Sequence, residues 1–168
     1  QWRVALEQDP GSGELVSVNR GLNREFGAGP SPRLPKRQDV QRALDGGRYD
    51  SGPWSRSASP SFRNDLEGWS PPAPGLHNLV HVWVGGDMLA STSPNDPVFY
   101  LNHCNVDRFW AAWQEENGTG DYAPAQRDPT APAGHRPGDR LFVLEGDAPR
   151  ISETFDVSEI YSYDTLGR

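Results

Sequence analysis

The chain has 168 residues, which is enough for one domain with its own hydrophobic core. Its formal net charge of −7 argues against a general nucleic-acid-binding protein, because such proteins present a basic surface to phosphates. No apolar run reaches the roughly 18 residues of a membrane-spanning helix, so neither nucleic acid nor membrane is an expected partner.

With 18 glycines and 16 prolines, much of the chain is expected to be irregular. Residues 2–6 and 14–23 predict two extended segments, divided by the turn sequence DPGSG. Residues 33–47 predict a short helix, because apolar residues recur at helical spacing. Pro35 suits the start of this helix, and two glycines end it.

Residues 48–75 are rich in serine, proline and glycine and predict an irregular segment, interrupted by the motif SFRNDLEGW. A helix is predicted from about Leu76 to Trp83, closed by a pair of glycines. The strongest helix signal lies within residues 93–118. There Asn95 or Asp96 can cap the helix, a proline falls in its first turn and a glycine ends it.

The last part of the chain predicts less regular structure. Residues 119–138 read as a loop rich in proline and glycine. Residues 140–146 and 155–165 predict extended pieces that close the domain. We therefore expect one domain over residues 1–168. The sequence assigns no compartment, and secreted and cytoplasmic locations both stay open.

Two of the four histidines, His77 and His81, are four residues apart, which places both on one face of a helix. Such a pair alone is common. Asn78 stands where a zinc protease of the H-E-x-x-H type has glutamate, so that class is excluded. His103 follows in the strong second helix, which the intervening turn would bring antiparallel to the first. A histidine among apolar neighbours is usually a packed core residue, but three converging imidazoles suit copper or zinc.

The other candidate ligands are weaker. Cys104 neighbours His103 but points about 100° away on a helix, so it is not expected to be a ligand. His135 lies in a loop rich in turn residues, where a surface role is the expectation. The predicted ligand set is therefore three histidines.

The stretches GLHNLVHVWVGGDM and SPNDPVFYLNHCNVDRFWAAWQ together resemble the second copper-binding half of tyrosinases, specifically the actinobacterial kind. The shared pattern is H-x3-H, a Gly-Gly turn, S-P-N-D-P-V-F, and a single histidine followed by N-x-D-R-x-W. The upstream SFRNDLEGW is similar to the segment that precedes the first of those histidines in the family. The resemblance is strong over residues 60–115 and weak in the flanks.

The resemblance implies a mainly α-helical fold, half of a type-3 dicopper four-helix bundle with long irregular loops and a few short strands. It implies that His77, His81 and His103 hold the second copper of the pair. Glu67 and Asn78 match the family's two residues that position a water near the site, which helps to deprotonate a phenol. The connection SPPAPG after Glu67 is longer by two residues than the family pattern, which weakens the match at Glu67.

Three further residues match positions around the family's copper ligands. Phe99 matches the aromatic residue that packs against a ligand imidazole. Asp107 is a candidate acceptor for the second N–H of such an imidazole, with a surface ion pair to Arg108 as the alternative. Many members have two adjacent histidines where this chain has Asn102 and His103. Only the second is a ligand, so Asn102 would affect the pocket or the surrounding hydrogen bonds.

A type-3 site needs two copper ions and six histidines, whereas this chain has four histidines. We therefore expect this chain to be the C-terminal part of a cleaved or split enzyme. A second polypeptide would carry the first copper site, and each chain would give two helices to one four-helix bundle. This chain would then hold one copper ion of the assembled pair.

The implied activity is copper- and O2-dependent oxidation of phenols and o-diphenols to o-quinones, with a small phenolic substrate. A copper-delivery protein is a further expected partner, as in bacterial members of the family. An o-aminophenol oxidase with the same site is the nearest alternative. A non-catalytic oxygen carrier and a module with a single zinc or copper ion are alternatives of other classes.

Overall fold

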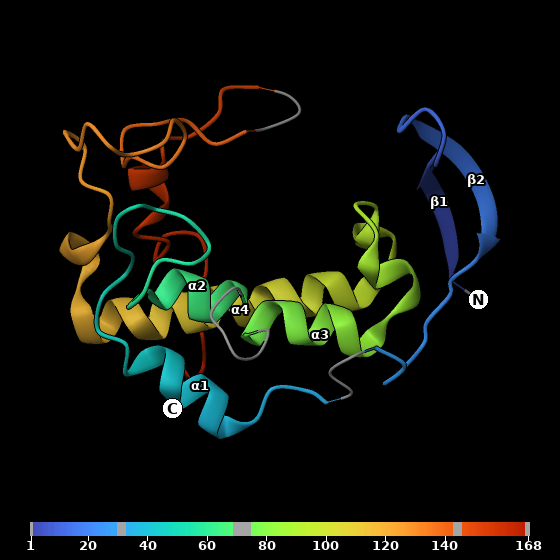
Figure 1. Cartoon of the computed structure of the whole chain (residues 1–168), viewed down its shortest axis with the longest axis horizontal. Helices are drawn as coiled ribbons and strands as arrows, with labels where there is room; N and C mark the ends of the chain where they lie inside the picture. The colour runs from blue at the N-terminus through green and yellow to red at the C-terminus, as the bar shows by residue number, and fades with distance from the viewer. Residues whose placement is uncertain (1, 30–32, 69–74, 143–145, 167–168) are drawn as a thin grey trace.

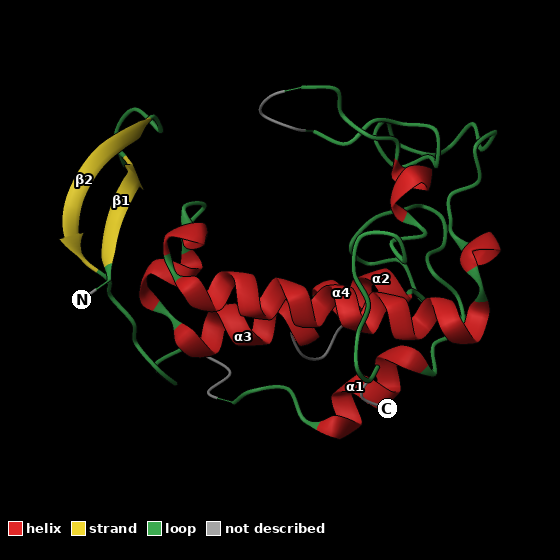
Figure 2. Ribbon diagram, turned by 180° about the vertical axis from the view of Figure 1, so that it is seen from behind, coloured by secondary structure: helices red, strands yellow, loops and turns green. Residues whose placement is uncertain are grey.

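The computed structural model describes residues 2–29, 33–68, 75–142 and 146–166, and it is mainly helical (Figure 1). Its described residues form four α-helices, short 3-10 turns and one sheet of two strands (Figure 2). The expected mainly α-helical fold with long irregular loops is confirmed. Among these residues, no helix has both the length and the apolar character that a membrane crossing requires.

A β-hairpin at one end of the molecule confirms the two predicted extended segments. Strand β1, Arg3–Gln8, pairs antiparallel with β2, Leu15–Gly21 (Figures 1 and 2). Asp9 accepts hydrogen bonds from two backbone amides of the turn, which closes the hairpin. The Asn95 side chain accepts from the amide of Ala5 and donates to the carbonyl of Leu6. This contact ties the hairpin to the segment that leads into the last α-helix.

Two short helices support one end of the core. Helix α1, Arg37–Leu44, lies inside the predicted range. Helix α2, Phe62–Glu67, forms within the motif SFRNDLEGW, where no helix was predicted. Ser61 caps α2 by accepting a hydrogen bond from the amide of Asn64. The core around these helices contains eight buried apolar residues: Ala43, Leu44, Phe62, Leu66, Leu76, Phe109, Ala112 and Trp113.

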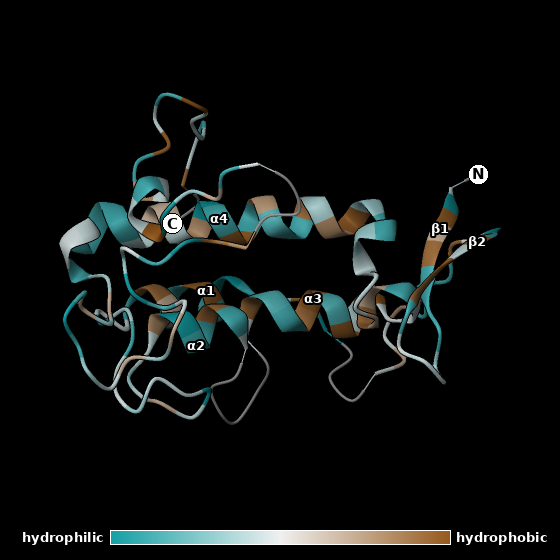
Figure 3. Cartoon of the chain, turned by 90° about the horizontal axis from the view of Figure 1, so that it is seen from above, coloured by the Kyte–Doolittle hydropathy of each residue, from teal (hydrophilic) through white to brown (hydrophobic). Residues whose placement is uncertain are grey.

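Helices α3, Leu76–Val84, and α4, Pro97–Asn117, confirm the two strongest helix predictions. Of the two predicted caps, Asp96 is the N-cap of α4, and its carboxylate accepts from the amide of Val98 at 2.8 Å. The connection reverses the chain, so α4 runs antiparallel beside α3, and Figure 3 shows it alongside the row of α1, α2 and α3. Gly85 ends α3 with a φ of 66° and lets the N-terminal segment approach closely, because a Cβ atom there would lie 2.9 Å from the carbonyl oxygen of Glu25.

The prediction of extended pieces near the end of the chain is wrong for the described residues. Arg140 makes one isolated bridge to Arg150, residues 143–145 lie outside the described part, and residues 155–165 are irregular. A strand needs a neighbour to pair its backbone, and none lies beside this segment among the described residues. The connection SPPAPG also lies largely outside the described residues, so its predicted extra length stays a prediction.

Candidate metal centre

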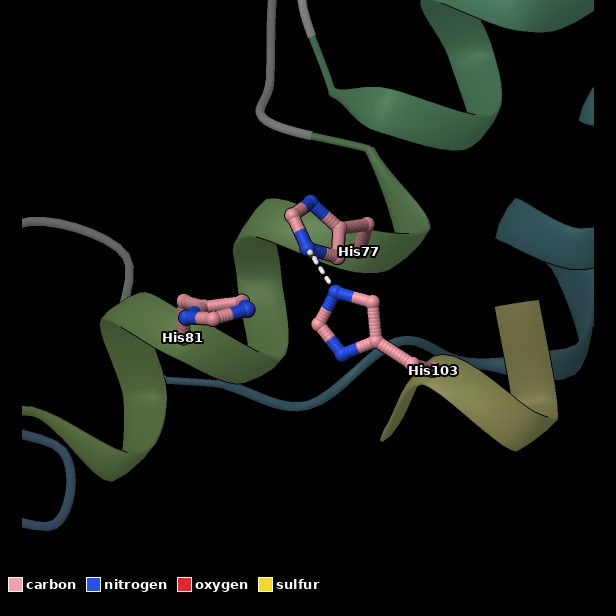
Figure 4. Close-up of side chains that lie close together, drawn as sticks. All are labelled: His77, His81 and His103. Atoms are coloured by element: carbon pink, nitrogen blue, oxygen red, sulfur yellow. Dashed lines mark hydrogen bonds between the residues drawn. The ribbon is translucent and has the colours of Figure 1, made fainter. Parts of the chain in front are cut away.

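Three imidazoles converge between α3 and α4 (Figure 4). His77 stands in the first turn of α3, His81 one turn later, and His103 comes from the facing side of α4. One nitrogen of each ring lies within 4.8 Å of the others, and Nε2 of His77 is 3.2 Å from Nε2 of His103. Helical spacing brings the first two rings together, and the antiparallel packing of α4 adds the third.

The Nδ1 atoms of all three rings face oxygen acceptors. His81 Nδ1 donates to the carbonyl of Met88 at 2.6 Å, and His103 Nδ1 donates to the carbonyl of Phe99 at 2.7 Å. His77 Nδ1 donates to Oδ1 of Asn78 at 2.9 Å. With the proton on Nδ1, each ring keeps a lone pair on Nε2. The acceptors therefore fix the tautomer and the orientation that metal binding requires.

The Nε2 atoms of His77 and His103 are spaced for one ion. Imidazole nitrogens bind a first-row ion such as zinc at about 2.0–2.1 Å, so two of them at a tetrahedral angle lie about 3.3 Å apart. The observed 3.2 Å between His77 and His103 agrees with that spacing. His81 Nε2 is buried and has no hydrogen-bond partner in the described part of the chain. A buried nitrogen without a partner is costly, and a bound ion satisfies it.

The electrostatics of the site favour neutral imidazoles. Burial lowers the pKa of His77 to about 4, and the neighbouring His81 and His103 add to the effect. Burial also lowers the pKa of His81, against the opposing effect of the Met88 carbonyl. Both rings are therefore neutral near pH 7, which is the protonation state of a metal ligand.

Phe99 covers one side of the centre. Its ring stacks on His103 with centroids 3.8 Å apart and meets His81 edge-on at 6.1 Å. Its backbone carbonyl also accepts the Nδ1 proton of His103, because the two residues are one helical turn apart. Phe99 therefore orients His103 and shields it from water, in the place that the resemblance implies.

Glu67 and Asn78 both lie at His77. The carboxylate Oε2 of Glu67 is 3.5 Å from His77 Nδ1, beside the closer Asn78 Oδ1. Burial raises the pKa of Glu67, with Arg63 and His103 acting in the opposite direction. The side chain still has 43% of its surface exposed. The two residues thus form a polar group at the edge of the histidine cluster.

Asp107 does not contact the histidines, so neither of its expected roles is observed. Its Oδ2 accepts hydrogen bonds from the hydroxyls of Tyr161 and Tyr163, at 2.7 and 2.5 Å. The imidazole protons go to other acceptors, and Arg108 pairs with Asn105 instead of Asp107. The helix turns Asp107 toward the C-terminal segment, which no local spacing could indicate.

Asn102 lies at the contact between the two histidine helices. It is 5% exposed, and its Nδ2 donates to the backbone carbonyl of His77 at 3.4 Å. The contact links α4 to the first turn of α3 beside the histidine cluster. His135 and Cys104 stand outside the cluster, as expected. The carbonyls of Met88 and Phe99 were missed as acceptors, and only the one-turn spacing between Phe99 and His103 could have indicated one of them.

A cavity of about 420 Å³ opens beside His77 and His81. Its remaining lining is largely small or apolar: Gly68, Asn78, Val82, Met88, Leu89, Ala90 and Ser93. A cavity of this size and composition holds a small aromatic molecule. The arrangement can therefore place an organic ring next to a bound ion.

Comparison with known proteins is consistent with this centre. Residues 6–116 match the family model described as the common central domain of tyrosinase. A tyrosinase from Streptomyces lincolnensis is 49% identical over 108 residues, which cover 64% of this chain and 38% of that protein. Grixazone synthase from Streptomyces griseus is 47% identical over 131 residues, covering 67% and 42%. Bos taurus tyrosinase is 36% identical over 117 residues, covering 62% and 21%. The chain thus spans less than half the length of these relatives.

Proposed function

The chain belongs to the tyrosinase family, and from this premise we propose that it supplies one copper site of a type-3 dicopper oxidase. The assembled enzyme converts phenols and o-diphenols to o-quinones with O2. The observation that carries the proposal is the convergence of three imidazoles whose Nδ1 atoms face oxygen acceptors. Zinc suits three imidazoles equally well, so the family membership decides for copper.

Bound copper supplies the redox chemistry that activates O2 and takes electrons from the phenol. The chain itself holds the imidazoles, admits the phenol and removes its proton. The carbonyls of Met88 and Phe99 keep two rings in the ligand tautomer, and the Phe99 ring excludes water from His103. The phenol ring enters through the cavity beside His77 and His81.

Removal of the phenol proton falls to Glu67 and Asn78. Burial raises the pKa of Glu67, which makes its carboxylate a better base, and a water held beside it can pass the proton on. The Oδ1 of Asn78 accepts a hydrogen bond from His77, and its Nδ2 lies beside Gly68. Glycine leaves room for this amide, because it has no Cβ atom. That amide is the donor that holds the water or the phenol oxygen.

The ligand count requires residues from outside these 168. A type-3 pair takes six histidines, and this chain has four, of which His135 stands outside the cluster. We propose that a second polypeptide brings the other three, so that this chain binds one copper ion by itself. The family membership and the three-histidine cluster support this proposal.

Copper content and quinone formation test the proposed function. The purified chain should bind one copper ion, and the copper-loaded assembly should turn a catechol into a quinone absorbing in the visible range. His103→Ala should lose both the ion and the quinone, whereas His135→Ala should keep both. A copper-loaded assembly that leaves catechol unchanged would refute the enzyme, and o-aminophenol in the same assay tests the nearest alternative substrate.

A further inference from the structure

The cavity beside His77 and His81 lies between a helix and an irregular segment. One wall belongs to α3, which carries both histidines. Most of the other wall belongs to residues 87–95, which lead from α3 to α4 and are called the connecting segment here. This segment lines the cavity with Met88, Leu89, Ala90 and Ser93. The helix wall is held by its own backbone hydrogen bonds, so the width of the cavity depends on what holds the connecting segment.

The β-hairpin holds both ends of the connecting segment. At its start, Arg20 of β2 donates two hydrogen bonds to the carboxylate of Asp87, at 2.9 and 2.6 Å. At its end, Nδ2 of Asn95 donates to the carbonyl of Leu6 in β1 at 2.7 Å. Figure 1 shows the hairpin at the end of the molecule where α3 and α4 are joined. The hairpin is therefore the support of this cavity wall.

The middle of the connecting segment, residues 89–91, is less packed. Leu89 is 61% exposed, and the two residues that follow it are exposed as well. The hydroxyl of Ser91 nevertheless reaches the hairpin, where it donates to Oε1 of Gln8 at 2.8 Å. Gln8 is itself held, because its Nε2 donates to the carbonyl of Gly13 in the hairpin turn at 2.9 Å. An exposed stretch with little packing takes its position from such contacts.

We propose that Gln8 is a positioning residue that sets the width of the cavity by holding Ser91, and that it thereby selects phenols without a bulky ring substituent. The proposal rests on the proposed function, which brings the phenol into this cavity. Without the contact, residues 89–91 are free to move away from α3, and the cavity admits a wider ring. A wall that yields in this way discriminates less between a slim and a bulky ligand.

Met88 provides a direct probe of this wall. It is the single methionine of the chain, it lines the cavity, and it is 1% exposed. A carbon-13 label on the methionine methyl group therefore gives one nuclear magnetic resonance signal, which shifts when an aromatic ring enters the cavity. The chain is loaded with zinc for this measurement, because imidazoles bind zinc and zinc does not oxidise the phenol.

The experiment compares a slim phenol with a bulky one. Dissociation constants of phenol and of para-tert-butylphenol are measured from the Met88 signal. Gln8→Ala and Ser91→Ala should each lower the preference for phenol over para-tert-butylphenol by about fivefold, as expected for the loss of one hydrogen bond. The double variant should show the same fivefold loss, because both substitutions remove the same contact. Gln8→Glu should keep the wild-type preference, since its carboxylate still accepts from the hydroxyl of Ser91.

The controls separate positioning from folding. Gln41→Ala removes a similar glutamine contact, the bond to Asp45 at the end of α1, and should leave the preference unchanged. Circular dichroism and one zinc ion per chain should show that every variant folds. An unchanged preference in Gln8→Ala, or additive losses in the double variant, would overturn the positioning role and leave the proposed function intact. A wild-type Met88 signal that does not respond to phenol would instead contradict the use of this cavity in the proposed function.

Discussion

The two nitrogens of each imidazole in the centre have different tasks. Nδ1 faces an oxygen of Met88, Phe99 or Asn78, and Nε2 is left free to bind an ion. The ring is held before any ion binds, so less orientational freedom is lost on binding. Two of the acceptors are backbone carbonyls, which mutation of a side chain cannot remove.

Asn78 provides a prediction at the residue scale. Asn78→Ala should lower hydroxylation of a monophenol about a hundredfold more than oxidation of the matching o-diphenol. Only hydroxylation depends on removal of the phenol proton, in which the Asn78 amide holds the water or the phenol oxygen. Quinone formation from phenol and from catechol, measured side by side at full copper loading, checks this. If both activities fall by the same factor, Asn78 acts by positioning His77 instead.

At the scale of elements, two partly buried ion pairs hold the start of α4 and the turn before it. Asp96 is fully buried, caps α4 and receives two hydrogen bonds from Arg24 at 2.7 Å. Asp87 receives two from Arg20 and one from the amide of Asn23. These contacts attach the N-terminal segment to the helices that carry the histidines.

Removing the cap of α4 should be costly. Asp96→Ala loses the capping bond and leaves Arg24 without its carboxylate, so the free energy of unfolding should fall by about 3 kcal/mol. Urea unfolding followed by circular dichroism measures this change. Asp121→Ala, at the exposed end of a short 3-10 turn, is the control and should stay within about 0.5 kcal/mol of the wild type. A similar loss in both variants would contradict the role of Asp96.

Asp87 makes stability depend on pH. Hydrogen bonds from Arg20 hold the pKa of Asp87 below its ordinary value of 3.8, so the folded state binds fewer protons than the unfolded state. The stabilisation is complete above about pH 5 and is lost as pH falls through the lowered pKa. Asp87→Asn should therefore be less stable by about 1–2 kcal/mol at pH 7 and closer to the wild type at pH 3. Unfolding curves at both pH values test this, and a constant difference would contradict it.

At the scale of the whole molecule, the histidine cluster connects helices α3 and α4. A ligand that binds only the folded state stabilises it by mass action, by about 2.7 kcal/mol at a hundred times its dissociation constant. Copper should therefore raise the melting temperature of the chain by about 5–10 °C. A chelator should reverse the shift, and His103→Ala should show none. A shift that persists in the variant would place the ion elsewhere.

The sequence alone determined the parts that depend on local spacing. Three features follow from short-range sequence patterns, which neighbouring residues are enough to define. They are the i, i+4 pair His77 and His81, the cap and proline of α4, and the hairpin turn. The family resemblance followed from the same local motifs. Helix α2 escaped prediction because six residues carry too little periodicity.

Only the tertiary structure decided which groups meet across the chain. The ring of His77 meets that of His103, 26 residues later, and the hydroxyls of Tyr161 and Tyr163 reach Asp107 although they are 54 and 56 residues away in the chain. A backbone carbonyl has no sequence signature, and an extended pattern becomes a strand only beside a partner strand. Local spacing thus placed each histidine near the oxygen that accepts its Nδ1 proton, whereas long-range packing brought His103 of α4 against His77 of α3.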